Sequence, residues 1–285
     1  MSGLARASSL CALALGLALG GPAAAGPPAA GGEPPARVVS INLCTDQLAM
    51  LLAAPGQLLS VSHLARDPRS SAMAEAAEGW PANGGRAEDV YLLVPDLVLA
   101  GSFTTPASVA MLRRLGIRVE TFPPANSLDD VPAQLLRMGR LLGREAEAEA
   151  VAGEFETALA ALFLEGEGPR AALYGANGWS SGRHSLPGEV LAAAGFANVA
   201  AELGLETGGF LPLEALVLAT PELIVTGRPW PGASRAEALP RHPALAQSTA
   251  RAVALTDRDW VCGLPHVLNA VEAMLDARRN LGDGP

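Results

Sequence analysis

Aromatic side chains and clustered positive charge are both scarce in this sequence. Phe, Trp and Tyr make up 4% of the 285 residues, and the formal net charge at pH 7 is -9. The arginines never run beyond a pair. Because a phosphate backbone is bound by clustered Lys and Arg, this pattern argues against nucleic acid as a partner. Because aromatic residues are so few, those that fall in predicted loops are informative about a binding site.

Long apolar runs are also few, and the clearest one lies at the start of the chain. Arg6 precedes an apolar run at residues 10–19, and the small residues 22–25 resemble a cleavage site. The run is too short to cross a bilayer as a helix. We therefore interpret residues 1–25 as an export signal, which implies a periplasmic protein. Residues 26–36, rich in Gly and Pro, are predicted to be a flexible tether.

Only three cysteines are present. Cys11 lies inside the apolar run and not after it, which argues against a lipid-anchored protein. Cys44 and Cys262 would remain in an oxidising compartment after cleavage. They form a disulfide only if the fold brings their Cα atoms within about 7 Å, and the sequence leaves a disulfide and two buried free thiols equally open.

Strand-like and helix-like segments alternate over most of the chain. This alternation predicts mainly parallel sheets that are covered by helices on both faces. Thr45 is expected to cap the first helix, and Ser127 with Asp130 resembles the capping box of a later one that ends at Gly143. The predicted strands are residues 37–41, 58–62, 96–100, 118–122, 170–174, 222–226 and 251–256.

One long helix divides this alternation into two halves. Residues 144–166 are rich in Ala, Leu and Glu, lack proline, and carry apolar residues at helical spacing. About twenty helical residues span roughly 30 Å, enough to connect two lobes. We predict an α/β protein of two Rossmann-like lobes, residues 37–143 and 167–285, bridged by this single connecting helix.

The two halves contain matching segments. Glu88 is followed by DVYLLV, Pro95-Asp96, an apolar strand and Gly. Glu214 is followed by ALVLAT, Pro221-Glu222, an apolar strand and Gly, and the spacing from glutamate to proline is the same. The repetition favours lobes related by pseudo-symmetry. Each glutamate falls near a helix start, so the residues leave open a local helix-dipole role and docking to a two-fold symmetric partner.

Ligands of open α/β sheets bind beyond the carboxyl ends of the strands, and the loops there carry most of the aromatic residues. Exposed rings with polar side chains between them suit a mid-sized ligand that is partly planar and partly polar. For any single ring, a role in covering its own lobe stays open. The candidate ligand-binding residues are Asn42, Cys44, Thr45, His63, Arg66, Phe103, Tyr174, Asn177, Trp179, Phe210, Arg228, Trp230 and Trp260.

Catalytic and metal sites are weaker hypotheses. The stretch GWSSG around Ser180 matches the G-x-S-x-G hydrolase elbow, and Asp257 or Asp259 followed by His266 has the chain order of a triad. The elbow requires a helix directly after the serine, whereas several residues intervene before Pro187. We keep a secreted serine hydrolase as the alternative. The four histidines show no spacing typical of metal ligands, so no metal site is predicted.

Taken together, the layout resembles the periplasmic substrate-binding proteins of ABC importers for iron-siderophores, haem and cobalamin. The segments that carry the resemblance are RVVSINLCTDQLAMLLA, EDVYLLVPDLVLAG, LGIRVETF, SLDDVPAQLLRMGRLLGREAEAEAVAGEF, NVAAE and LEALVLATPELIVTG. The resemblance implies the class III periplasmic binding protein fold and no enzymatic activity. It also implies that Glu88 and Glu214 dock with arginines of an inner-membrane ABC permease.

The same resemblance implies a metal chelate as ligand, either a ferric siderophore or a cobalamin-like corrinoid. Any iron or cobalt would belong to the ligand, and no cofactor of the protein is expected. Cobalamin-binding relatives place tryptophans near the first Pro-acid strand and ahead of each docking glutamate, where this chain has Phe103, Trp80 and Phe210. Arg66, Arg183 and Arg228 are available to an anionic ligand. A monomer is expected.

Overall fold

The computed structural model describes residues 33–164, 166, 168–228, 234–246, 250–255 and 257–282. The described residues from Pro34 onward form one compact unit. The predicted export signal and most of the predicted tether lie outside the described residues. None of the described helices is both long enough and apolar enough to cross a membrane.

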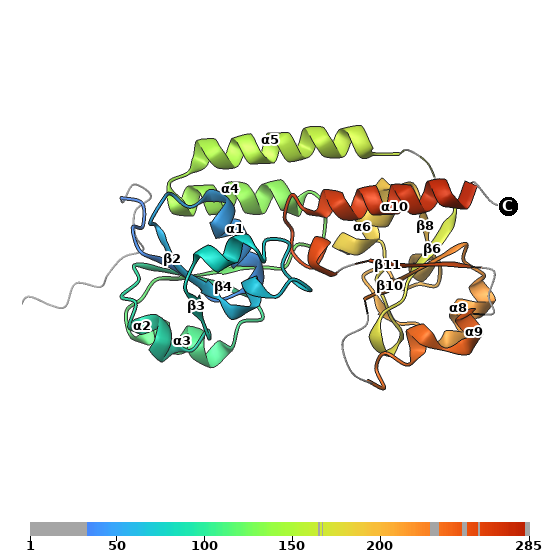
Figure 1. Cartoon of the computed structure of the whole chain (residues 1–285), viewed down its shortest axis with the longest axis horizontal. Coiled ribbons are helices and arrows are strands. Elements are labelled where there is room, and N and C mark those ends of the chain that lie inside the picture. Colours follow the sequence, from blue (N-terminus) through green and yellow to red (C-terminus); the bar gives the residue numbers. More distant parts are fainter. Residues whose placement is uncertain are drawn as a thin grey trace, which may run out of the picture. The chain divides into compact units, whose positions relative to one another are not determined.

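The first half of the chain forms a sheet of five parallel strands in the order β3-β2-β1-β4-β5. Helices α1 and α4 cover one face of this sheet, and α2 and α3 cover the other (Figure 1). The strands are β1 (Val38–Ser40), β2 (Leu58–Ser62), β3 (Ala82–Asn83), β4 (Leu97–Gly101) and β5 (Val119–Phe122). The helices are α1 (Leu43–Leu52), α2 (Ala87–Tyr91), α3 (Pro106–Arg114) and α4 (Asp130–Leu142).

The second half forms a separate sheet of four parallel strands in the order β11-β10-β6-β8. Helices α6 and α10 pack on one face of this sheet, and α8 packs on the other. The strands are β6 (Arg170–Leu173), β8 (Ala197–Asn198), β10 (Leu223–Gly227) and β11 (Arg251–Leu255). The helices are α6 (Leu186–Ala193), α7 (Val199–Glu202), α8 (Leu213–Ala219), α9 (Pro243–Ala246) and α10 (Val267–Gly282). A small antiparallel pair, β7 (Trp179–Ser180) with β9 (Gly209–Phe210), lies beside it.

Helix α5 (Glu145–Leu162) connects the two halves and packs against α4 and α10 (Figure 1). Ala148, Ala152 and Phe155 on its apolar face are buried, while its glutamates are exposed. The predicted α/β fold is therefore confirmed, because two mainly parallel sheets are present and a single long helix bridges them.

The two halves also contact each other through a hydrogen bond and through a shared apolar core. The Glu189 carboxylate on α6 accepts a hydrogen bond from the backbone N–H of Leu128, at 2.6 Å, just ahead of α4. Core side chains of α1, α4, α5, α6 and α10 belong to one continuous apolar cluster. This shared core limits how far the halves can separate.

The helix ends show which local signals were decisive. Ser127 and Asp130 form the predicted capping box, since each side chain accepts a hydrogen bond from the other's backbone N–H, and α4 ends at Gly143 with φ 69°. The prediction that Thr45 caps α1 is wrong. Asn42 is the cap, and its Oδ1 accepts hydrogen bonds from the N–H groups of Cys44 and Thr45.

Candidate functional site

A hollow of about 220 Å³ opens at the carboxyl ends of the strands in the first lobe. Three predicted ligand residues, Asn42, His63 and Phe103, line it. The Phe103 ring is 87% exposed, so it presents an uncovered apolar surface at the rim. The full lining comprises Ile41, Asn42, Ser62, His63, Leu64, Gly84, Gly85, Phe103, Thr104 and Thr105.

A second hollow, of about 150 Å³, lies at the carboxyl ends of β6 and β10 in the other lobe. It also contains three predicted residues, Tyr174, Trp179 and Trp260. Its full lining comprises Leu173, Tyr174, Gly175, Trp179, Ser181, Pro187, Val225, Thr226, Gly227 and Trp260. Both lobes therefore have a hollow at the position where parallel sheets bind ligands.

Two predicted rings of the second lobe contact each other. Trp179 and Phe210 lie on the paired strands β7 and β9, with ring centroids 5.4 Å apart and planes at 85°. Such edge-to-face contact is a favoured geometry for aromatic pairs. The Phe210 side chain is 67% exposed and that of Trp179 is 47% exposed, so the pair still offers ring surface to a ligand.

A disulfide between Cys44 and Cys262 joins the first turn of α1, next to the first hollow, to the loop next to the second hollow, with Cα atoms 5.2 Å apart. Cys44 lies two residues after Asn42, and Cys262 lies two residues after Trp260. The structure thus selects the disulfide from the two options that the sequence left open. The Cys44 sulfur is consequently not a free thiol that could bind a ligand.

Two other predicted ligand residues, Thr45 and Tyr174, are buried. Burial contradicts direct ligand contact for Thr45, whereas Tyr174 lines the second hollow. Thr45 is 0% exposed, and its hydroxyl is used by the Asn42 carbonyl and the Ser40 hydroxyl. Tyr174 is 1% exposed, and its hydroxyl has no hydrogen-bond partner among the described residues. Burial, together with the nearby charge of Glu214, raises the pKa of Tyr174.

Asp46 is a buried residue that holds Ser62, one of the residues lining the first hollow, in place. Its carboxylate accepts hydrogen bonds from the backbone N–H of Ser62, at 3.0 Å, and from the Ser62 hydroxyl, at 2.5 Å. Ser62 directly precedes the 3₁₀ helix η1 (His63–Arg66), whose first residues line the hollow. Burial raises the pKa of Asp46 to about 6, although the hydrogen bonds that its carboxylate accepts act in the opposite direction.

The remaining candidates are more scattered. Arg66, Asn177 and Arg228 are exposed but line neither hollow. The Arg66 guanidinium donates a hydrogen bond to the Trp80 carbonyl. Trp230 lies outside the described residues.

The serine hydrolase alternative is wrong. Ser180 is 0% exposed, and its hydroxyl donates a 2.6 Å hydrogen bond to the carbonyl of Leu173. Strand β7 turns this side chain into the lobe, and α6 begins only at Leu186. A hydroxyl held in this way cannot attack a substrate.

Within the described part of the chain, no group of three or more His, Cys, Asp or Glu side chains is placed to hold a metal ion.

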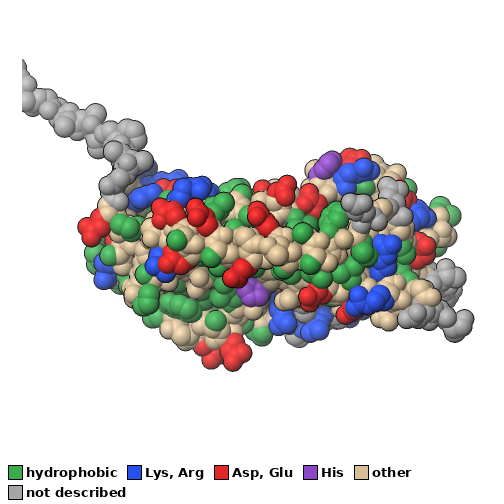
Figure 2. All heavy atoms as spheres, turned by 90° about the horizontal axis from the view of Figure 1, so that it is seen from above, with side chains coloured by type: hydrophobic (Ala, Val, Ile, Leu, Met, Phe, Trp, Pro, Cys, Tyr) green, Lys and Arg blue, Asp and Glu red, His purple; other side chains and the backbone are tan. Residues whose placement is uncertain are grey.

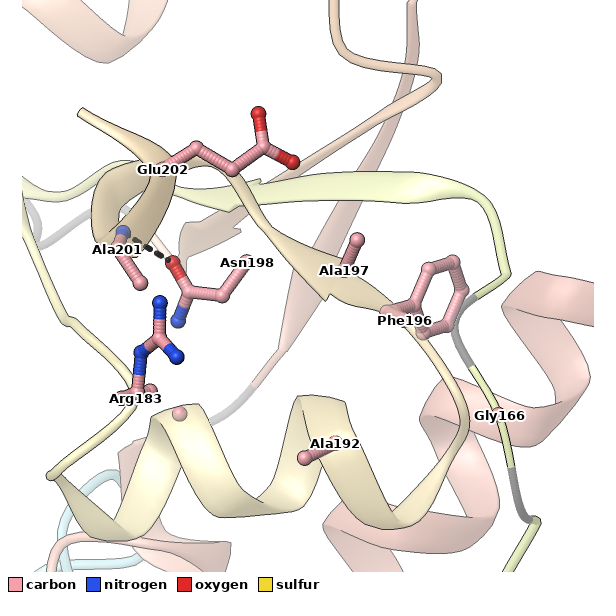
Figure 3. A pocket seen from close by; sticks show the side chains of 9 residues that line it. Gly166, Arg183, Ala192, Phe196, Ala197, Asn198, Ala201 and Glu202 are labelled. Carbon is pink, nitrogen blue, oxygen red and sulfur yellow. Dashed lines mark hydrogen bonds between the residues drawn. The ribbon is translucent and has the colours of Figure 1, made fainter.

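A third hollow, of about 300 Å³, lies away from these loops beside β8, α6 and α7 (Figure 3). Its polar side chains already have partners. Asn198 accepts a hydrogen bond from the Ala201 N–H, and Arg183 is ion-paired with Glu206 at 2.7 Å. Arg183, predicted to be available to an anionic ligand, therefore belongs to this hollow, and we assign the hollow no ligand.

The matching Pro-acid segments form the same hydrogen bonds in both lobes. The Asp96 carboxylate accepts hydrogen bonds from the backbone N–H groups of Ala36 and Arg37, the nearest at 2.8 Å. The Glu222 carboxylate accepts one from the backbone N–H of Arg170, at 2.6 Å. Each acid thus binds the amino end of the neighbouring central strand, β1 or β6.

The two arginines at these strand ends bind the helices that carry the matching glutamates. The Arg37 guanidinium donates hydrogen bonds to the carbonyls of Leu93 and Val94, at 2.7 and 2.8 Å, just beyond α2. The Arg170 guanidinium donates one to the carbonyl of Ala219, at 2.5 Å, the last residue of α8. Both helix ends are therefore fixed to the sheet.

The backbone repeats as well. Val94 and Thr220 have φ values of 45° and 48°, which are uncommon for residues other than glycine. Each directly precedes the proline of its segment, Pro95 or Pro221. The repeat of sequence, hydrogen bonds and backbone confirms the predicted pseudo-symmetry of the lobes, and it places Glu88 and Glu214 at equivalent, exposed positions in the first turns of α2 and α8.

The charged side chains seen on the α5 face are mixed in sign. Figure 2 shows carboxylates and arginines interspersed on this face, with apolar side chains between them. Together with the net charge of -9, this surface differs from the basic surfaces that bind nucleic acid.

Comparison with known proteins identifies the family. The periplasmic binding protein family matches residues 38–253. A cobalamin-binding protein of Halobacterium salinarum is 30% identical over 200 residues, which are 68% of this chain and 54% of that protein. The chain thus spans about half the length of this curated relative.

Solved structures show the same fold. The periplasmic heme-binding protein from Roseiflexus sp. RS-1 in apo form superposes with a TM-score of 0.70 at 22% identity, over 86% of this chain and 98% of that one. A periplasmic heme binding protein from Pseudomonas aeruginosa gives a TM-score of 0.66 at 25% identity, over 85% of this chain and 92% of that one. The fold is that of class III periplasmic binding proteins. The chain therefore belongs to the periplasmic binding protein family.

Proposed function

We propose that this chain is the solute-binding component of an ABC importer and that it captures a metal chelate between its lobes for delivery to an inner-membrane permease. The observation that carries the proposal is the pair of hollows at the carboxyl ends of the two sheets, whose neighbouring segments are joined by the Cys44–Cys262 disulfide. A ligand held by loops of both lobes would be enclosed without any covalent chemistry.

The exposed rings favour a ligand with a flat apolar face. Phe103 on the first lobe and the Trp179–Phe210 pair on the second present ring surface next to the hollows. Haem, a cobalamin-like corrinoid and an aromatic ferric siderophore all share this chemistry, and the metal is part of the cargo. Arg66 and Arg228, both exposed, are near enough in sequence to the lining loops to pair with anionic groups of the ligand.

Restricted motion follows from the connections between the lobes. Helix α5 is packed against both halves, and the disulfide joins them a second time near the ligand loops. We expect small closing movements rather than a wide hinge motion, with affinity arising from preformed surfaces.

Delivery would use the twin glutamates. Glu88 and Glu214 are exposed and equivalent, and no ion pair to either carboxylate is found among the described residues. Arg86, the nearest arginine to Glu88 in sequence, is paired with Asp89 instead. Two such carboxylates suit a partner that presents a basic residue twice, as a dimeric permease does.

The setting proposed is the periplasm, with the chain acting as a monomer. The export signal predicted in residues 1–25 and the disulfide, a bond that forms and persists in oxidising compartments, both support the periplasmic setting.

Native mass spectrometry and visible absorbance of the protein purified from iron-starved and from cobalamin-fed cells test the ligand proposal. We expect a single bound chelate with the absorbance of haem, a corrinoid or a ferric siderophore. Protein that carries none of these from either culture, and takes up none when they are added, would contradict it.

A second experiment tests delivery. Replacing Glu88 and Glu214 together by Ala should leave chelate affinity unchanged, because neither residue lines a hollow, while uptake into proteoliposomes that contain the permease should fall at least tenfold. Asp89→Ala, next to Glu88 but already ion-paired, is the matched control and should transport normally. Loss of chelate binding in the double variant would assign the glutamates to the ligand site instead.

A further inference from the structure

Each exposed glutamate is accompanied by an exposed leucine four residues later. Leu92 follows Glu88 and is 78% exposed, and Leu218 follows Glu214 and is 82% exposed. Residues four apart on a helical turn lie on the same face, so each leucine neighbours its glutamate. The residues two positions after each glutamate, Val90 and Leu216, are 0% exposed and belong to the core.

The repetition is what makes these leucines informative. A single exposed leucine on a protein surface is ordinary and requires no explanation. Here the same residue is uncovered at the same position of both copies of the repeated unit. On the first lobe, Tyr91 and Val94 are also exposed, at 50% and 70%, and enlarge the apolar surface.

The helix ends that carry the leucines are held in place by the sheets. Arg37 binds the carbonyls of Leu93 and Val94 directly after Leu92, and Arg170 binds the carbonyl of Ala219 directly after Leu218. The leucines are therefore presented on fixed backbone, and little conformational freedom remains to be lost when a partner covers them.

We infer that Leu92 and Leu218 form, with Glu88 and Glu214, twin docking patches for the membrane permease. Each patch would place its leucine in an apolar recess of the permease that lies beside a basic side chain. The inference rests on the proposed function and adds the apolar half of the interface. Charge complementarity selects this partner. The carboxylates that flank both leucines have no ion pair with any residue that the structure describes, and the partner must offer the same chemistry twice.

Apolar contact and ion pair support each other in such an arrangement. Covering the leucine removes water from the neighbouring carboxylate and its partner cation, which strengthens their attraction. Apolar residues at the centre with charged groups around them are also the usual anatomy of protein interfaces. The leucines would thus contribute to affinity, and the glutamates to orientation and specificity.

The test measures binding of the ligand-free, full-length chain to the permease with its ATPase subunits in lipid nanodiscs, by biolayer interferometry. Leu92→Ser and Leu218→Ser should each weaken binding about tenfold, which corresponds to about 1.4 kcal/mol, and the double variant about a hundredfold. Leu164→Ser is the matched control, because Leu164 is 41% exposed but follows α5, far along the chain from both patches. It should bind as wild type.

Separate results identify a failure of the inference and a failure of the proposed function. If the leucine double variant binds the permease as wild type while the Glu88→Ala, Glu214→Ala variant does not, the apolar contact is refuted and the proposed function stands. If wild type does not bind the permease at all, both are refuted. If wild type is a dimer on size-exclusion chromatography and the leucine variant is a monomer, a second copy of the chain covers the patches, and the inference is overturned.

Discussion

Removal of the interlobe disulfide should destabilise this protein strongly. Cys44 and Cys262 are separated by 218 residues, so their bond closes a very large loop in the unfolded chain. The chain-entropy relation gives about 5 kcal/mol of stabilisation at 25 °C for a loop of this size. Measured values are commonly lower, and we expect a loss of about 2 to 5 kcal/mol for the Cys44→Ala, Cys262→Ala variant.

Urea unfolding monitored by far-UV circular dichroism measures this loss. With a slope of about 3 kcal/mol per M, the midpoint should fall by roughly 0.7 to 1.7 M. Wild type treated with dithiothreitol is the matched control and should unfold near the midpoint of the double variant. The variant itself should be insensitive to the reductant.

The same variant tests whether the bond organises the ligand site. Because the bond joins segments that lie beside both hollows, chelate affinity should fall as well, by about tenfold or more. A variant with the midpoint of oxidised wild type would refute the reasoning, since the loops would then be held together by packing alone.

Two further predictions concern stability. Asp46 has a pKa of about 6 in the folded protein against an ordinary 3.8, so the folded state holds the proton more tightly, and stability should fall by about 3 kcal/mol in total as pH rises from about 3 to about 7. Asp46→Asn should flatten this dependence in urea titrations across that range, and an unchanged slope would refute the assignment. Gly139→Ala should cost about 1 to 3 kcal/mol, because its Cβ would lie 2.4 Å from that of Ala148. Gly153→Ala on α5, with open space around it, is the control and should stabilise by about 0.5 to 1 kcal/mol in the same thermal melts, whereas equal effects would contradict the close packing of α4 and α5.

Long elements with regular patterns could be predicted from the sequence. The apolar spacing of α5 and the alternation of strands with helices gave the two-lobed architecture, because burial of one helix face leaves a strong periodic signal. The repeated Pro-acid segments could also be recognised from the sequence. Their hydrogen bonds to Arg37 and Arg170 were not, since nothing in the sequence places these distant residues beside them.

Short elements and burial at strand ends escaped prediction. Strands β3 and β8 have two residues each and carry no periodicity, so the lining residues Gly84 and Gly85 after β3 were missed. Tyr174 and Ser180 stand at ends of strands where exposure is usual, yet neighbouring segments cover both. Burial there depends on tertiary packing, which a local pattern does not encode.

The cap of α1 illustrates competition between two adequate signals. Asn42 and Thr45 are both good helix caps, and the earlier residue is the one with extended backbone, φ -148° and ψ 136°. Thr45 is thereby drawn into the first turn and buried. The cap position matters for function. With Asn42 as the cap, Thr45, a predicted ligand residue, lies in the core, and Asn42 lines the hollow.

The central claim, that the two lobes together hold a metal chelate, is tested most directly by titrating the purified chain with haem, cyanocobalamin and ferric siderophores while recording tryptophan fluorescence. Trp179 and Trp260 line the second hollow, so a coloured chelate bound there should quench them. We predict saturable one-to-one quenching by one of these chelates, with an affinity that Phe103→Ala, on the opposite lobe, lowers at least tenfold. Quenching by none of them, or binding that Phe103→Ala leaves unchanged, would contradict the account.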